Sequence, residues 1–140
     1  MKQFPSKLNF KKYHKINYFY IRLLDNKNFF SKFGQYGIQS LSASKLNFRQ
    51  IEACRRTIKR GLNKLGFIFI RVFTNVPVTK KPISSRMGKG KGGISSWVSI
   101  IKKGQIVFEI SGINSLSAEY VLRKCRNQLP FKSKIVKVFF

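Results

Sequence analysis

The sequence predicts an α+β fold, a two-layer sandwich in which two helices cover a mostly antiparallel sheet. To this we add a long basic glycine-rich loop and an extended N-terminal arm. Two segments, 47–65 and 116–129, repeat apolar residues every three or four positions, which is the period of an amphipathic helix. Short apolar runs bounded by glycine, proline or polar turns surround them, as strands do. A chain of 140 residues, 43% hydrophobic, is long enough for one domain with its own core.

The first 33 residues are expected to form an extension with a basic and an aromatic part, and residues 34–140 a single domain. Residues 1–15 are basic and without a sustained period, which predicts an extended arm. Residues 16–33 hold two aromatic clusters around a polar turn at 25–28, a pattern compatible with a hairpin. Residues 34–44 follow, with a short strand-like stretch between glycines that contains Tyr36, Ile38 and Leu41.

The first helix is predicted from about residue 47 to residue 65. Its apolar face would carry Ile51, Cys54, Ile58, Leu62 and Leu65. Asn47 suits the N-cap and Gly66 the position just after the helix. The remaining surface holds Arg49, Arg55, Arg56, Lys59, Arg60 and Lys64. Since only Glu52 balances these charges, a face turned to phosphates is favoured over an ordinary solvated surface.

The later elements alternate strands with a second helix. The run 67–73 is apolar except for Arg71 and predicts a strand that is covered on both faces or lies centrally. Residues 97–101 and 106–110 flank a short polar turn and predict an antiparallel hairpin. The second helix, 116–129, would be capped by Ser115 or Ser117 and ended by Pro130. Its inner face would carry Ala118, Val121, Leu122, Cys125 and Leu129. Residues 135–140 predict a closing strand.

Charge is the strongest feature of the composition. Lys and Arg total 29 against 4 acidic residues, a formal net charge of +25. Such self-repulsion opposes a compact isolated chain and predicts a polyanionic partner. Nucleic acid is the first candidate, because basic side chains that neutralise phosphates release counterions; an anionic membrane surface is the second. No apolar run is long enough for a bilayer span, so we expect no membrane insertion.

The same composition argues against an enzyme. The four carboxylates are far apart in sequence and the only histidine is His14, whereas acid–base pairs and triads need such groups together. Cys54 and Cys125 have no metal-binding spacing, so neither a metal nor a cofactor is expected. Both cysteines fall on predicted apolar faces and are best explained as small buried residues. A disulfide between them stays open.

A loop at 75–96 is the strongest functional candidate. It has no period, and irregular segments of this length in a compact domain are usually functional or disordered. Prolines stiffen its first half, and its second half alternates glycines with lysines. Glycines let the backbone approach a surface while the lysines reach phosphates. The spacing differs from that of a nucleotide-binding P-loop, so contact with an RNA backbone is favoured over a mononucleotide site or a flexible linker.

Several motifs resemble the large-subunit ribosomal protein sixteen family. They are Arg71-Val72-Phe73, Pro77-Val78-Thr79, Lys81-Pro82, Arg86-Met87-Gly88-Lys89-Gly90-Lys91-Gly92 and Trp97-Val98. Outside the loop, the stretches at 10–15, 49–56 and 129–132 resemble the family as well. The resemblance covers nearly the whole chain, and its loop motif is highly specific.

The resemblance implies a structural constituent of the large ribosomal subunit, docked on large-subunit rRNA beside aminoacyl-site tRNA, near the peptidyl transferase centre and among other ribosomal proteins. The implied rRNA-binding residues are Lys11, Lys12, His14, Lys15, Arg49, Arg55, Arg56, Arg60, Arg71, Lys80, Lys81, Arg86, Met87, Gly88, Lys89, Gly90 and Lys91. The residues implied to lie near the tRNA are Arg55, Arg56, Lys59 and Arg86. A free RNA-binding assembly or splicing factor is the alternative, and a small basic nuclease the third possibility.

Residues 16–31 depart from the family, because they are more apolar and aromatic than its usual basic segment. We expect the side chains of 16–33 to pack on the domain's own sheet or on a neighbouring ribosomal protein, with stacking on unpaired rRNA bases as the alternative. The abundance of Phe, Ile, Lys, Asn and Tyr, all with AT-rich codons, points to an AT-rich genome. The first residues show neither a signal core nor a leader, and a protein encoded in an organelle or made by a bacterium needs none. A mitochondrial ribosome is expected; a plastid or an AT-rich bacterium is the alternative.

Overall fold

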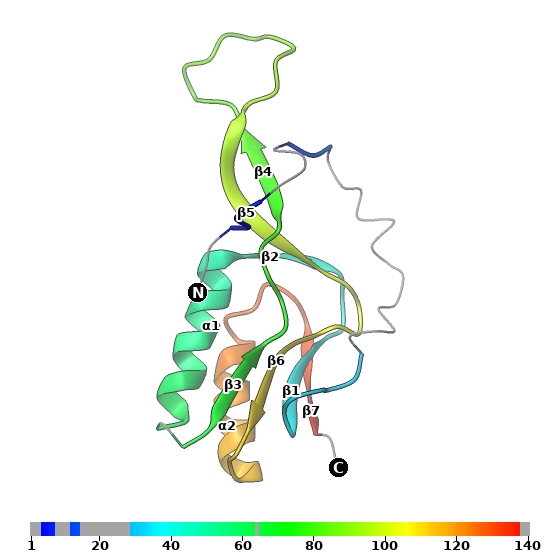
Figure 1. The fold of residues 1–140 in the computed structure, drawn as a ribbon, viewed down its shortest axis with the longest axis vertical. Coiled ribbons are helices and arrows are strands. Elements are labelled where there is room, and N and C mark those ends of the chain that lie inside the picture. The colour runs from blue at the N-terminus through cyan, green and yellow to red at the C-terminus, as the bar shows by residue number, and fades with distance from the viewer. Residues whose placement is uncertain (1–3, 8–11, 15–28, 64, 138–140) are drawn as a thin grey trace.

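Two antiparallel sheets and two helices form the fold in a computed structural model of the chain (Figure 1), which describes residues 4–7, 12–14, 29–63 and 65–137. The strands are β1 (Tyr36–Ser40), β2 (Ser44–Asn47), β3 (Phe67–Ile70), β4 (Val76–Lys80), β5 (Gly93–Ile101), β6 (Ile106–Ser111) and β7 (Ser133–Lys137). The helices are α1 (Phe48–Gly61) and α2 (Ser115–Arg126). The predicted α+β sandwich is confirmed. No helix in the described part of the chain is long and apolar enough to cross a membrane.

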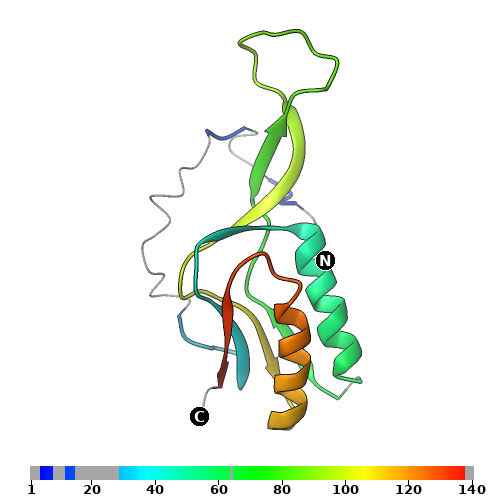
Figure 2. The same cartoon turned by 180° about the vertical axis from the view of Figure 1, so that it is seen from behind.

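The core lies between the helices and the four-stranded sheet, whose strand order is β3-β6-β1-β7. Figure 2 shows α1 and α2 side by side on one face of this sheet. Ile38 and Phe108 from the sheet meet Ile58 and Leu122 from the helices, and all four are fully buried. Burying a side chain of this size stabilises the fold by about 1.5–3 kcal/mol. The predicted strand around Tyr36 and Ile38 is β1, in the middle of this sheet.

The first helix begins as predicted and ends early. Asn47 is the N-cap, and its backbone N–H donates to the Gln50 Oε1 at 2.9 Å. The helix stops at Gly61 because Asn63 turns the backbone to a φ of +45°, a conformation that asparagine tolerates better than most residues. Leu62 is still buried, but Leu65 is 78% exposed. The prediction that Leu65 belongs to the apolar face is therefore wrong.

The second helix has the predicted inner face and a different cap. Ala118, Val121, Leu122 and Cys125 are buried, and Leu129 packs against the core from beyond the helix end. The N-cap is Asn114, whose backbone is extended, and not Ser115 or Ser117. Both serines already lie in the helix, so their backbones cannot make the turn into it. Cys54 and Cys125 are buried and free of a disulfide, as small apolar residues would be.

The predicted hairpin between residues 97–101 and 106–110 is wrong. β5 pairs with β2 and β4 in a three-stranded sheet, whereas β6 pairs with β1 and β3. The turn between them bonds elsewhere: the N–H of Gly104 donates to the carbonyl of Ser40 at 2.8 Å, and the N–H of Ser40 donates to the carbonyl of Gln105 at 2.9 Å. With Gly104 at a φ of +85°, the chain passes from one sheet to the other.

The strand from Phe67 is shorter and more exposed than predicted. β3 ends at Ile70 and is an edge strand, with Phe67 70% exposed. Ile68 and Ile70 pack into the core, while Phe69 shares the opposite face with Glu109, its partner in the register. The prediction of a strand covered on both faces or central is therefore wrong: β3 lies at the edge of the sheet, and on its outer face Phe33 covers Phe69 but leaves Phe67 exposed.

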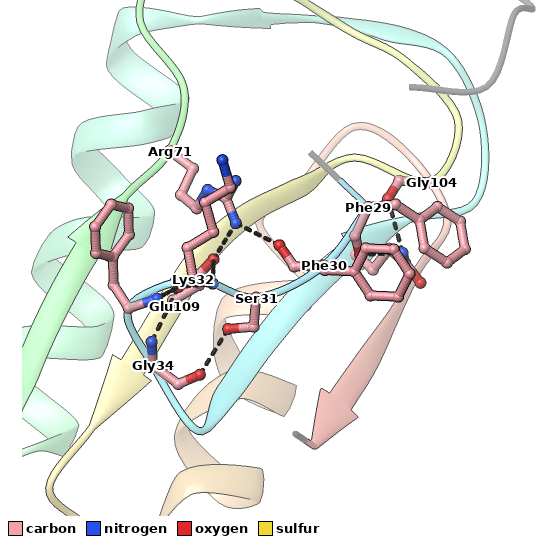
Figure 3. A network of polar contacts seen from close by, with 10 residues as sticks. Phe29, Phe30, Ser31, Lys32, Gly34, Arg71, Gly104 and Glu109 are labelled. Atoms are coloured by element: carbon pink, nitrogen blue, oxygen red, sulfur yellow. Dashed lines mark hydrogen bonds and ion pairs between the residues drawn. The ribbon is translucent and has the colours of Figure 1, made fainter. Parts of the chain in front are cut away.

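Residues 29–34 cross the outer face of the four-stranded sheet (Figure 3). Phe33 stacks on Phe69 with ring centroids 5.5 Å apart, and Phe29 meets Phe30 edge-on at 5.6 Å. The expected packing of this aromatic segment on the protein's own sheet is thus present at Phe33. The hairpin expected at 16–33 and the rest of its packing fall mostly on 15–28, outside the described residues. The closing strand, β7, is described as far as Lys137.

Candidate nucleic-acid interface

A long antiparallel hairpin, β4 and β5, carries the predicted functional loop away from the core (Figure 1). Residues 76–80 and 93–96 are strand, so the irregular loop is 81–92 and not 75–96. Pro77 and Gly93 argue against strands in the sequence. They are tolerated here because β4 is at the edge of its sheet, where a missing N–H breaks no ladder, and Gly93 begins β5.

The tip of this hairpin presents the predicted basic motif to solvent. Lys80 and every residue from 81 to 91 are exposed, and Met87 is fully so. The Lys81 ammonium donates to the carbonyl of Gly88 across the loop. A Cβ added to Gly88 or Gly90 would meet nothing within 4 Å, whereas one at Gly92 would lie 2.5 Å from the carbonyl oxygen of Lys80. Gly92 therefore closes the loop, and the other two glycines leave its backbone uncovered.

The N-terminal arm lies against the same hairpin. Lys12 Nζ donates to the carbonyl of Lys91 at 3.1 Å, and the Lys91 ammonium donates to the carbonyl of Tyr13. Further along the arm, the Phe4 ring stacks on Trp97 at 6.2 Å. Two basic motifs almost eighty residues apart in sequence thus form one surface. The predicted contacts Lys11 and Lys15 lie outside the described residues.

Beside these contacts, a cleft of about 1030 Å³ lies between the arm and the hairpin. Its basic lining is His14, Lys45, Lys81, Lys89 and Lys91, and no carboxylate is among the described residues around it. Tyr13 and Val78 add apolar surface. Lys45 was not predicted from the sequence. It lies in β2, which pairs with β5, and only that pairing brings it to the hairpin.

A second basic surface runs along α1. Arg49, Arg56, Lys59 and Arg60 are exposed and Arg55 is half-buried. Glu52 accepts two hydrogen bonds from Arg55, at 2.8 and 2.6 Å, and one from Arg56 at 3.2 Å. The hydrogen bond from Arg55 is the main cause that lowers the pKa of Glu52 to about 2. Glu52 is thus ionised near neutral pH and orients two arginines, while the helix keeps a large positive excess.

Arg71 is placed differently from its prediction (Figure 3). Its side chain is only 6% exposed and forms an ion pair with Glu109, whose side chain is fully buried. The guanidinium also donates to the carbonyl of Phe30 at 2.7 Å. Arg71 is therefore an internal residue of the fold, and the prediction that it contacts rRNA is withdrawn.

Glu109 also holds the N-terminal segment in place. Its Oε2 accepts backbone N–H groups from Lys32 at 3.2 Å, Phe33 at 2.7 Å and Gly34 at 3.0 Å. Burial by itself would raise the pKa of Glu109, but Arg71 and the backbone donors together lower it below its usual value. A charged Glu109 therefore ties residues 32–34 to the centre of the sheet.

The described residues offer binding chemistry and little else. Glu52, Glu109 and Glu119 are each in an ion pair with arginine. Within the described ranges, no three histidine, cysteine or acidic side chains gather as a metal site would require. Exposed lysines and arginines on a projecting hairpin and on a helix define a small, strongly basic binding protein, suited to a polyanionic partner.

Comparison with known proteins identifies the family. The profile of the family ribosomal protein L16p/L10e matches residues 5–136. The large ribosomal subunit protein uL16 of Fusobacterium nucleatum is 44% identical over 112 residues, 80% of this chain and 78% of that protein. The uL16 of Psychrobacter arcticus is 49% identical over 105 residues, 75% and 77% of the two chains. That of Buchnera aphidicola is 40% identical over 132 residues, 94% of each.

The chain therefore belongs to the ribosomal protein L16p/L10e family. The family resemblance drawn from the sequence motifs is confirmed, and the relatives named above are bacterial. A protein of this family is a structural component of the ribosome and not an enzyme.

Proposed function

We propose that this protein is a structural constituent of the large ribosomal subunit that binds large-subunit rRNA and helps to position tRNA at the aminoacyl site, near the peptidyl transferase centre. The observation that carries the proposal is the contact of Lys12 with Lys91, which joins the arm and the hairpin loop into one basic surface. The names of its relatives, large ribosomal subunit protein uL16, support the choice of particle.

The proposed rRNA contacts fall into two groups. On the hairpin and arm they are Lys12, His14, Lys80, Lys81, Arg86, Met87, Gly88, Lys89, Gly90 and Lys91, with Lys11 and Lys15 added by their positions in the basic motif. On α1 they are Arg49, Arg55, Arg56 and Arg60. Uncovered glycine backbone lets the loop approach RNA closely, and the flanking lysines then reach its phosphates. The arginines of α1, two of them oriented by Glu52, suit phosphate oxygens.

The proposed tRNA-proximal residues are Arg55, Arg56, Lys59 and Arg86. The first three share the basic surface of α1, and Arg86 lies at the hairpin tip. An RNA that bridges hairpin and helix would contact both surfaces. For the compartment we propose a mitochondrial ribosome, because the codon composition points to an AT-rich genome; a plastid or an AT-rich bacterium is the alternative, and the bacterial relatives fit the latter.

The hairpin is tested by the double substitution Lys89→Ala and Lys91→Ala. Its matched control is Lys132→Ala with Lys134→Ala, which removes the same charge from exposed positions at and before β7. Binding of a large-subunit rRNA fragment is measured over a range of salt concentrations. The hairpin variant should bind more weakly, with a log–log salt slope shallower by about one per lysine, and with unchanged circular dichroism. The control should keep the parent slope. Equal slopes in the two variants, or lost secondary structure in the hairpin variant, would contradict the proposal.

The alternative function, a free RNA-binding assembly or splicing factor, makes a different prediction for the cell. A ribosomal constituent stays at one copy per large subunit through a moderate-salt wash, because it is part of the particle. A free factor dissociates or remains substoichiometric. Quantifying the chain in washed large subunits of the native organism, from purified mitochondria and from the remaining cell fraction, separates the two functions and tests the compartment.

A further inference from the structure

The two edges of the four-stranded sheet are protected to different degrees. The β7 edge carries Lys134 and Lys137, and lysines on an edge strand discourage pairing with another chain. The β3 edge has the sequence Phe-Ile-Phe-Ile, with neither a charge nor a proline. The chain has a net charge of +25, yet this edge carries four consecutive apolar residues and none of the charges that protect the β7 edge.

The backbone of β3 is available for pairing on its outer side. The N–H of Arg71 donates to the carbonyl of Val107 at 3.0 Å, so the odd-numbered residues of this strand face β6 in the antiparallel ladder. The N–H and carbonyl groups of Ile68 and Ile70 therefore point away from the sheet. In the described part of the chain, no other strand pairs with this side of β3.

The side chains beside this edge form an apolar surface. Leu65 is 78% exposed, Phe67 70% and Phe33 59%. A shallow groove of about 470 Å³, lined by Ile70, Arg71, Val72 and Phe73, continues the edge beyond the end of β3. The only charge along it, that of Arg71, is turned inward to Glu109. Among the four residues that line the groove, no charge is turned outward, although the neighbouring Lys32 is exposed.

We propose that the β3 edge binds an extended segment of another protein of the large subunit, which adds a fifth strand to the sheet. The segment would pair with the outward groups of Ile68 and Ile70 and place apolar side chains on Phe67 and in the groove at residues 70–73. The ladder of alternating donors and acceptors is complementary to a polypeptide backbone, and the four residues of β3 carry no charge that would attract RNA phosphates. The inference rests on the proposed function for the particle in which the partner is found.

The first experiment identifies the partner in the assembled particle. A photo-reactive phenylalanine analogue is placed at position 67 in one strain and, as control, at Leu116 of α2, which is 83% exposed. Large subunits are purified, irradiated and analysed by mass spectrometry. Position 67 should give an adduct with an extended segment of one ribosomal protein, and position 116 should not give that adduct. An adduct of position 67 with rRNA, or with a second copy of this chain, overturns the inference.

A second measurement tests strand addition itself. In large subunits, the amides of Ile68 and Ile70 should exchange hydrogen at least about tenfold more slowly than in the free protein, whereas the amide of Phe69, already turned to β6, should change little. Phe67→Lys, which protects this edge as β7 is protected, should reduce retention of the chain in salt-washed subunits severalfold relative to Leu116→Lys. Unchanged exchange at Ile68 and Ile70 overturns the inference. Absence of the chain from large subunits overturns the proposed function as well, and the two failures are thereby distinguished.

Discussion

Removing the charge of Glu109 should destabilise the protein far more than removing the charge of a surface carboxylate. Glu109→Gln keeps the size of the side chain, yet leaves the guanidinium of Arg71 without its counter-charge in a side chain that is 6% exposed. It also weakens the acceptor for the backbone N–H groups of Lys32, Phe33 and Gly34. Breaking a buried ion pair by removing one partner costs about 3–5 kcal/mol, a large part of the 5–15 kcal/mol that stabilise a typical domain.

The matched control is Glu119→Gln on α2. Glu119 and Arg123 also form an ion pair, 2.6 Å apart, but their side chains are 48% and 68% exposed. An exposed pair at this helical spacing contributes about 0.3–0.5 kcal/mol. Unfolding by urea at high and constant ionic strength, followed by circular dichroism, gives the free energy of unfolding of each variant. Ionic strength is kept high because the chain carries a net charge of +25.

A third variant separates charge from packing. In the double variant Arg71→Met with Glu109→Gln, the uncompensated charge is gone, so we expect it to be more stable than Glu109→Gln alone by about 1 kcal/mol or more. A cost that depended on packing alone would instead add up across the two substitutions. The reasoning is refuted if Glu109→Gln and Glu119→Gln lower the free energy of unfolding equally, or if the double variant is the least stable of all.

The remaining predictions concern pH, the loop and the isolated chain. The pKa of Glu109 is lowered in the folded protein. Its contribution to stability should therefore be complete above the unfolded pKa of about 4.3 and should be lost as the pH falls through the folded pKa. Glu109→Gln should show less acid destabilisation over that range, and parallel curves of unfolding free energy against pH for the two proteins would contradict this. Gly92→Ala should distort the hairpin, because its Cβ would lie 2.5 Å from the carbonyl oxygen of Lys80, whereas Gly93→Ala meets nothing within 4 Å; we expect weaker rRNA binding for the first only, with an equal loss in both as the refuting result. The isolated protein should be marginally folded or aggregate at low salt and gain stability as salt screens its charge, so a thermal midpoint that does not rise with salt would count against self-repulsion.

Periodicity gave the helices and most of their buried faces, because the core-facing residues of an amphipathic helix recur locally. The ends of the helices depended on single backbone conformations, those of Asn63 and Asn114, which no period encodes. Strand partners were harder still. Residues 97–110 have the local pattern of a hairpin, yet the turn at Gly104 bonds to Ser40 and divides the two strands between sheets. Pairing of this kind is non-local and lies outside a sequence window.

The candidate interface shows the same division. The lysines of the loop were found from composition, because glycine and lysine alternate within a few residues. Arg71 was misplaced because sequence gives the charge of a side chain and not its burial. Lys45 was missed, and the meeting of Lys12 with Lys91 was not foreseen, because both depend on strand and arm positions set by distant residues.

The length of β5 gives the hairpin mechanical leverage. Its nine residues run from the loop to the core, a span of about 30 Å at roughly 3.3 Å per residue. Val98 pairs on one side with Val76 of β4 and on the other with Asn47, the N-cap of α1. From Val98 to Gly93, where the loop begins, β5 runs five residues, about 17 Å at roughly 3.3 Å per residue, so a tilt of about 5° at Val98 would move that end of the strand by roughly 1.5 Å. The hairpin is thus anchored through Val98 to the residue at which α1 begins, and a force on the loop is transmitted to the start of the basic helix.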